Sequence, residues 1–196
     1  MRLPNSVGWL VALLGGTLCV LEGALILANP QYYLFDSFSG YLVLMVEGAA
    51  LLSLSAALVW LRATHSGSLG RVGTAGFLAA FVGTVLAGSG HVFGLPFFEF
   101  VNTGSMAYVL IGVGQGVFLG WGTAYVVGVI LMSAGYLLLG TGVMRAGTPP
   151  RWVGPLLIVG TAALWFGNAV GWILWGLAWI LVAYAARPGK SARTAA

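Results

Sequence analysis

The chain is dominated by long apolar stretches that are separated by short polar gaps. Most of these stretches have about the 20 residues that a helix needs to cross the roughly 30 Å hydrocarbon core of a bilayer. The last two are shorter, and we expect them to thin the bilayer locally or to pack against longer neighbours. The pattern predicts an all-α protein, a polytopic transmembrane helix bundle with six spans. The predicted spans are Val7–Ala28, Ser39–Leu61, Val72–Leu95, Thr123–Met144, Trp152–Phe166 and Ala169–Ala186.

The apolar stretch Gly104–Gly122 precedes the predicted fourth span without any intervening charge. Reading the two together as two spans would put Arg145 and Arg151 on the opposite side of the membrane from Arg62 and Arg71. A single span keeps all four on one side. We therefore expect Gly104–Gly122 to be one outer interfacial or re-entrant segment, because its glycines weaken an independent helix but permit close packing on the bundle.

The basic residues give the predicted orientation. All eight fall in gaps between spans or at the ends of the chain, so a six-span path places every one of them on the cytoplasmic side. We expect both termini to be cytoplasmic, with a single transmembrane helical domain over residues 1–186 and a short basic cytoplasmic tail over 187–196. The expected location is a cell membrane, specifically a bacterial inner membrane. The eight residues are Arg2, Arg62, Arg71, Arg145, Arg151, Arg187, Lys190 and Arg193.

Composition excludes several classes of protein. Charged residues are 6% of the chain, against about 25% in a soluble domain, so this chain cannot cover a water-facing surface. The net charge of +4 comes from single residues at span ends rather than from a basic stripe, so we predict no nucleic-acid partner.

Glu22 interrupts the first apolar run and no A-x-A site follows it, which favours a retained span over a signal peptide. Cys19 is interpreted as a packing residue, with a reactive thiol as the alternative.

Two acidic residues, Glu22 and Glu47, lie inside predicted spans. A charged side chain at the bilayer centre costs about 2.5 kcal/mol or more, so such a residue is a functional hypothesis by default. Glu22 lies about 9 Å and Glu47 about 12 Å below the outer end of its span, from a rise of 1.5 Å per residue. Because consecutive antiparallel spans pack side by side, we expect the two carboxyls to face the bundle interior and to approach each other in the outer half.

Three further polar residues fall on the predicted outer side. They are His91 near the end of span three, Gln115 in the outer segment and Asn168 between the last two spans. With Glu22 and Glu47 they would form an outer ligand- or ion-binding pocket that holds a shared proton, a cation or a small polar ligand. A divalent metal bound through oxygen and nitrogen ligands is one alternative. In another, each Glu is protonated and simply bonds a neighbouring helix, and His91 is an ordinary interfacial histidine.

Small residues recur at four-residue spacing on three segments, and such stripes let helices approach closely in lipid. The stripes are Gly15, Cys19 and Gly23; Gly76, Ala80, Thr84 and Gly88; and Gly112, Gly116 and Gly120. The simplest interpretation is packing within the monomer. A homo-oligomer or a partner in a membrane complex is the alternative, beside the lipid bilayer itself.

Two motifs resemble a set of small, uncharacterised bacterial membrane proteins with six spans. One is the G-x-x-G-F-L-x-A-x-x-G-T pattern at Gly73–Thr84, and the other is the R-A-G-x-x-P-R-W-x-G-x-L-L-I-x-G pattern at Arg145–Gly160. The resemblance covers spans three to six and implies an outer loop before span four. It implies no activity, so it assigns no catalytic residue and no cofactor.

The function predicted best is binding or transport of a proton, a cation or a small polar ligand at Glu22 and Glu47. The alternative is a non-catalytic accessory or structural subunit of a membrane complex. The chain lacks a phosphate loop and the H-E-x-x-H, C-x-x-C and G-x-S-x-G motifs, which argues against common enzyme classes without excluding an unusual membrane enzyme.

Overall fold

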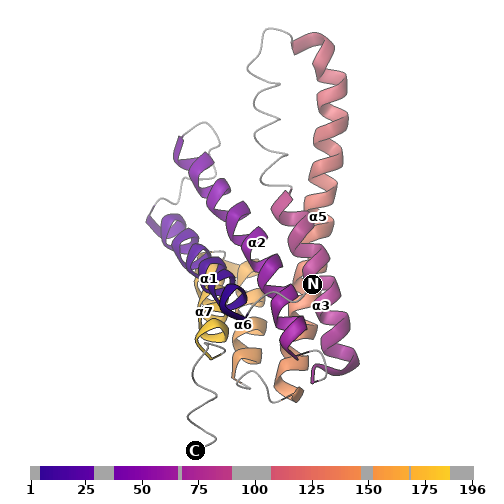
Figure 1. The fold of residues 1–196 in the computed structure, drawn as a ribbon. Coiled ribbons are helices and arrows are strands. Elements are labelled where there is room, and N and C mark those ends of the chain that lie inside the picture. The colour runs from indigo at the N-terminus through magenta and orange to yellow at the C-terminus, as the bar shows by residue number, and fades with distance from the viewer. Residues whose placement is uncertain are drawn as a thin grey trace, which may run out of the picture.

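The computed structural model describes residues 5–28, 38–65, 68–89, 107–146, 152–167 and 169–185, and the regular structure in these ranges is entirely helical (Figure 1). Four helices contain stretches long and apolar enough to cross a membrane, and α6 and α7 are shorter apolar helices. At 15 and 17 residues, these two are about 22 and 26 Å long. The helices are α1 (Asn5–Ala28), α2 (Phe38–His65), α3 (Gly70–Ser89), α5 (Ala107–Ala146), α6 (Val153–Gly167) and α7 (Ala169–Ala185).

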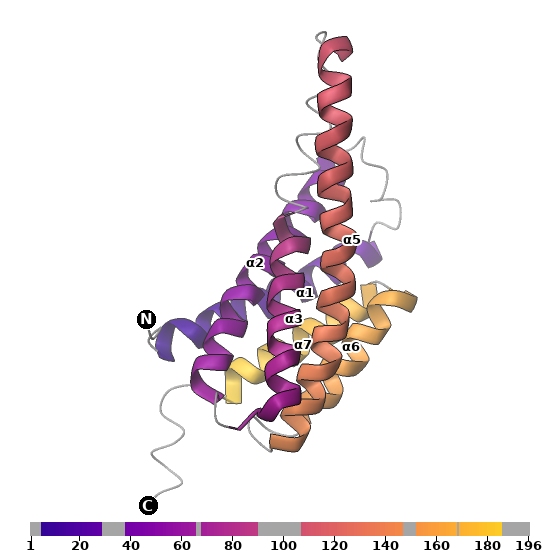
Figure 2. The same ribbon diagram turned by 90° about the vertical axis from the view of Figure 1, so that its right-hand side faces the viewer.

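The described helices form a closed ring in chain order. Each packs against the next one along the chain, and α7 packs back against α1. Consecutive helices run in opposite directions (Figure 1). In Figure 2, α3 and α5 stand almost upright, whereas α1 and α7 lie obliquely beside them. The ring leaves a central space that side chains from several helices fill.

The α3–α5 pair is held together by glycines on both helices. Gly83 lies against the backbone of Gly128, where an added Cβ would stand 2.6 Å from the carbonyl oxygen. Farther along the pair, Gly76 faces Leu139, and Gly73 faces Gly142. Without side chains between them the two backbones come into direct contact, which maximises van der Waals packing in a medium where burial itself gives no driving force.

The glycine stripe of α1 is used in the same way on two neighbours. Gly15 packs against Leu54 of α2, and Gly23 packs against Ala169 and Ile173 of α7. Gly16 and Gly176 meet backbone to backbone, each with the other's carbonyl oxygen within 2.7 Å of a built Cβ. The stripes predicted on spans one and three therefore serve packing within this chain, as the simplest interpretation required.

The prediction of a separate outer segment before span four is wrong in one respect. Residues Ala107–Ala146 form one uninterrupted 40-residue helix, so no break separates Gly122 from Thr123. The glycines did not end the helix because each costs only about 1 kcal/mol, whereas a broken backbone in an apolar setting leaves hydrogen-bonding groups unsatisfied. The first part of α5 extends beyond the end of α3 in both views (Figures 1 and 2).

The other predicted boundaries differ by a few residues. Helix α2 continues to His65, beyond the predicted end at Leu61, and α3 is described as far as Ser89. The remainder of the predicted third span lies outside the described residues, as does the predicted tail over 187–196.

Three arginines that the structure describes lie at one end of the ring. Arg62 is in the last turn of α2, and Arg71 follows after a short turn at the start of α3. The contact between Gly73 and Gly142 then places Arg145 at the same level, near the end of α5. Gly70 enters α3 with a φ of 62°, a left-handed conformation that glycine adopts without steric cost.

Candidate functional site

The register of α1 against α2 brings Glu22 and Glu47 together. Gly8 lies against Trp60, and Gly15 lies against Leu54. Two helical turns farther along each helix, the same antiparallel register places Glu22 level with Glu47. This level lies in the half of the pair opposite to Arg62, which is about 22 Å away along α2 at 1.5 Å per residue.

The two carboxyls are in contact inside the bundle. A side-chain hydrogen bond joins Glu22 and Glu47. Glu22 is 1% exposed, whereas Glu47 is half-buried. The second carboxyl oxygen of Glu22, Oε2, is buried and has no hydrogen-bond partner among the described residues. The pair therefore has one side that is closed inside the protein and one side that is partly open.

The hydrogen bond has a chemical consequence. Two ionised carboxylates are acceptors only, so a hydrogen bond between them requires a proton on at least one. Close carboxyls resist double ionisation because their like charges repel. Removal of this proton without a replacement would leave two negative charges in a region of low dielectric constant, which is costly.

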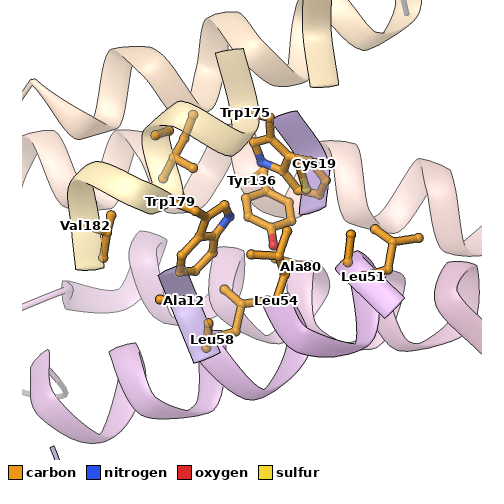
Figure 3. Close-up of a cluster of buried hydrophobic side chains, with 14 of the residues drawn as sticks. Ala12, Cys19, Leu51, Leu54, Leu58, Ala80, Tyr136, Trp175, Trp179 and Val182 are labelled. Atoms are coloured by element: carbon orange, nitrogen blue, oxygen red, sulfur yellow. The ribbon is translucent and has the colours of Figure 1, made fainter. Parts of the chain in front are cut away.

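A buried aromatic cluster lies next to the pair, in the interior of the bundle. Cys19, one turn before Glu22 on α1, is close enough to interact electrostatically with both carboxyls and with Tyr136 of α5. The Tyr136 ring makes edge-on contacts with Trp175 and Trp179 of α7, at centroid distances of 4.6 and 6.2 Å. Figure 3 shows the ring of Tyr136 between the two indoles, with Cys19 beside Trp175. This cluster fills the centre of the ring of helices.

Several polar atoms of this interior have no hydrogen-bond partner among the described residues: the indole nitrogens of Trp175 and Trp179 and the hydroxyl of Tyr136. Thr84 is close to Tyr136, but its own hydroxyl donates to the Ala80 carbonyl at 2.6 Å. Buried polar groups are normally paired, so their accumulation beside a buried acid pair marks this region as unusual.

Sequence reasoning did not single out these tryptophans and therefore missed the cluster. A signal was present, because Trp172, Trp175 and Trp179 are spaced by three and four residues and so share one face of a helix. Nothing in the sequence indicated that Tyr136 of α5 would meet that face.

The side chains of the other three predicted site residues are not among those that the structure describes. His91 and Asn168 lie outside the described residues. Gln115 lies in α5, in the part of that helix whose side chains fall outside the description. No group of three or more His, Cys, Asp or Glu side chains that could hold a metal ion occurs among the described residues. The described part of the site is thus the acid pair with Cys19 and the aromatic cluster.

The fold defines a helical integral membrane protein that crosses the bilayer several times. Its helices are apolar, and they expose large apolar side chains such as Leu14, Leu78 and Ile130 on their outer faces, as expected where lipid rather than water is the neighbour. Comparisons with the chain found no matching protein family, no similar characterised protein and no similar solved structure. The comparisons therefore assign no role to any residue.

Proposed function

We propose that this protein binds a proton, a cation or a small polar ligand at the Glu22–Glu47 pair, in the outer half of the membrane, and that it uses this site for binding or transport. The observation that carries the proposal is the hydrogen bond between the two carboxyls beside a Glu22 oxygen that lacks a partner among the described residues. A buried acid inside a membrane helix is expensive, which makes it a functional hypothesis by default.

Orientation is the second part of the proposal. The arginine-rich end of the ring faces the cytoplasm, which places both termini there and the acid pair toward the outside. The shared level of Arg62, Arg71 and Arg145 supports this orientation, since positive residues accumulate on the cytoplasmic side of bacterial membranes. The glycine stripes of α1 and α3 are covered within the chain, so an accessory role would need a different surface for its partner.

Cysteine labelling tests the orientation. In a Cys19→Ser background, Ser68→Cys marks the turn between α2 and α3, and Asp36→Cys marks the predicted outer loop. We expect a membrane-impermeant maleimide to label Asp36→Cys in intact cells and to label Ser68→Cys only after permeabilisation. Labelling of Ser68→Cys in intact cells would reverse the orientation and place the acid pair on the inner side.

Proton counting tests the site. We expect the purified protein, titrated from about pH 4 to pH 9, to release at least one more proton in total than the Glu22→Gln/Glu47→Gln double variant. Glu→Gln keeps the shape and the hydrogen-bonding capacity of the side chain while removing its titration.

The matched control is Glu99→Gln, which removes one carboxyl without changing the pair. This variant should still release more protons than the double variant. Identical proton release by the wild type and the double variant over the whole titration would show that the pair stores no exchangeable proton, and the proposed site would then be wrong.

A further inference from the structure

Helices α6 and α7 present a short outer face. On each helix the exposed large side chains recur at intervals of about two turns, so they form one stripe along the helix. The two helices are antiparallel, with Gly160 against Trp175 and Gly171 against Leu164, and this register sets the stripes side by side. Together the stripes are called the α6–α7 outer face, which consists of Trp152, Val159, Trp165, Val170, Leu177 and Tyr184.

Aromatic side chains with a polar tip mark both ends of this face. The register places Tyr184 level with Trp152, at the arginine end of the ring, and Trp165 lies at the other end. The large exposed side chains between these levels are aliphatic. Tryptophan and tyrosine accumulate where lipid headgroups meet hydrocarbon, so the face has the pattern of a membrane span with an interface at each end.

The distance between the two aromatic levels is short for a bilayer. Trp152 and Trp165 are about 20 Å apart along the helix at 1.5 Å per residue, whereas the hydrocarbon core of a bilayer is roughly 30 Å thick. On α1, by contrast, exposed apolar side chains run from Val7 to Leu27, about 30 Å by the same rise. One side of the ring therefore matches an ordinary bilayer, and the α6–α7 outer face does not.

The level of Trp165 is fixed by its contact with α5. The Trp165 indole nitrogen donates a hydrogen bond to Oγ of Ser133, 3.1 Å away. On α5, exposed apolar side chains continue from this level to Val126, about 10 Å farther from the arginine end. The apolar surface of the ring is thus shorter at α6 than at the neighbouring helix.

Lipid fits this face better than a second copy of the chain does. Helices approach each other in lipid through small residues, and the glycines of α6 and α7 whose contacts are described are turned toward other helices of the same chain. A span shorter than the surrounding hydrocarbon can be accommodated by thinning of the bilayer. The inward-facing glycines are Gly154, Gly160, Gly171 and Gly176.

We propose that the hydrocarbon core is thinned to about 20 Å where lipids meet the α6–α7 outer face, with one interface at Trp152 and Tyr184 and the other at Trp165. This inference goes beyond the proposed function and does not depend on it. Gly23 of α1 packs against Ala169 and Ile173, so the Trp165 end of the face lies at the level of the residue before Gly23, which is Glu22. Thinning brings the lipid–water interface on this side to the level of the acid pair.

Two exposed valines on opposite sides of the ring provide a matched comparison. Val170 of α7 is level with Trp165 by the register of α6 and α7. Gly83 of α3 lies against the residue before Ser133 on α5, so the neighbouring Val82 is level with Ser133, the partner of Trp165. Val170 and Val82 are 51% and 45% exposed. In a flat bilayer of uniform thickness, probes at these two positions would report the same depth.

Spin labelling tests the inference. In a Cys19→Ser background, Val170→Cys and Val82→Cys are labelled separately in dioleoyl phosphatidylcholine liposomes, with a nickel chelate on both sides of the membrane. Power saturation then gives the access of each label to the chelate, which stays near water, and to oxygen, which concentrates in hydrocarbon. We expect several-fold greater access of the chelate to Val170→Cys than to Val82→Cys. The difference should shrink in thinner dimyristoleoyl bilayers, where less thinning is needed.

Two further labels separate thinning from tilt and from self-association. Tyr184→Cys should also be open to the chelate, whereas Leu177→Cys, between the two ends, should be open to oxygen only. Tilt of the whole bundle would expose Val170→Cys but shield Tyr184→Cys from the chelate. A second copy on this face would shield Leu177→Cys from both reagents and broaden its spectrum by spin–spin coupling. Either of these results, or equal access of the chelate to Val170→Cys and Val82→Cys, would overturn the inference.

Discussion

Replacement of Gly135 with valine is expected to prevent the protein from accumulating in its folded form. A Cβ at Gly135 would stand 2.5 Å from the Cα of Ala80 and 2.7 Å from the carbonyl carbon of Ala79. These are backbone atoms of α3, so no side-chain rotation relieves the clash, and the two helices must separate. Overpacking of this kind costs about 3 kcal/mol or more, and separation of α3 from α5 would also open the ring around Tyr136.

The measurement is the fraction of detergent-solubilised protein that remains monodisperse in size-exclusion chromatography after heating. Ala134→Val is the matched control, because Ala134 is the adjacent residue and is exposed on the outer face of α5. Gly135→Val should lose the monodisperse peak at a markedly lower temperature than either the wild type or Ala134→Val. Similar curves for the two variants would mean that α3 and α5 do not pack through their glycines.

Replacement of Tyr136 with alanine is expected to have the second largest effect on stability. The Tyr136 ring is fully buried and contacts both Trp175 and Trp179. Truncation leaves a large cavity at the centre of the ring of helices, and deletions of buried aromatic rings typically cost about 3–5 kcal/mol. The indoles of α7 would lose the side chain that connects them to α5.

The Tyr136→Phe variant separates the contribution of the ring to stability from that of the hydroxyl. Because the hydroxyl has no hydrogen-bond partner among the described residues, its removal should change the free energy of unfolding by no more than about 1 kcal/mol. Heating curves of the two variants, followed by the same chromatography, check both expectations. A loss with Tyr136→Phe as large as that with Tyr136→Ala would mean that the hydroxyl, rather than the ring, stabilises the core.

The acid pair was predictable because its geometry depends on simple regularities. Helix rise gives the depth of Glu22 and Glu47 below the ends of their spans, and consecutive antiparallel helices are normally neighbours. These two regularities are enough to place the carboxyls at one level. The aromatic cluster was not predictable in this way, because Tyr136 and Trp175 lie on helices that are not adjacent in the ring.

The continuity of α5 is a feature that the hydropathy pattern did not predict. Orientation rules count the charges at the ends of apolar stretches, and the residues from Gly104 to Met144 carry no charge. The rules therefore predict the side on which Arg145 emerges but not whether the backbone breaks near Gly122. That depends on backbone hydrogen bonding and on contact with α3, neither of which is a property of the local sequence.

The sequence alone determined the membrane class, the helical secondary structure and the common level of two acids, because apolar length, helix rise and charge placement act locally along the chain. Only the tertiary structure decided that α7 returns to α1 and closes the ring, and that Glu22, Cys19 and Tyr136 lie in one interior. Helix–helix contacts in lipid depend on the match of small residues and side-chain shapes between distant segments. That match is a property of pairs of surfaces and cannot be obtained from either segment alone.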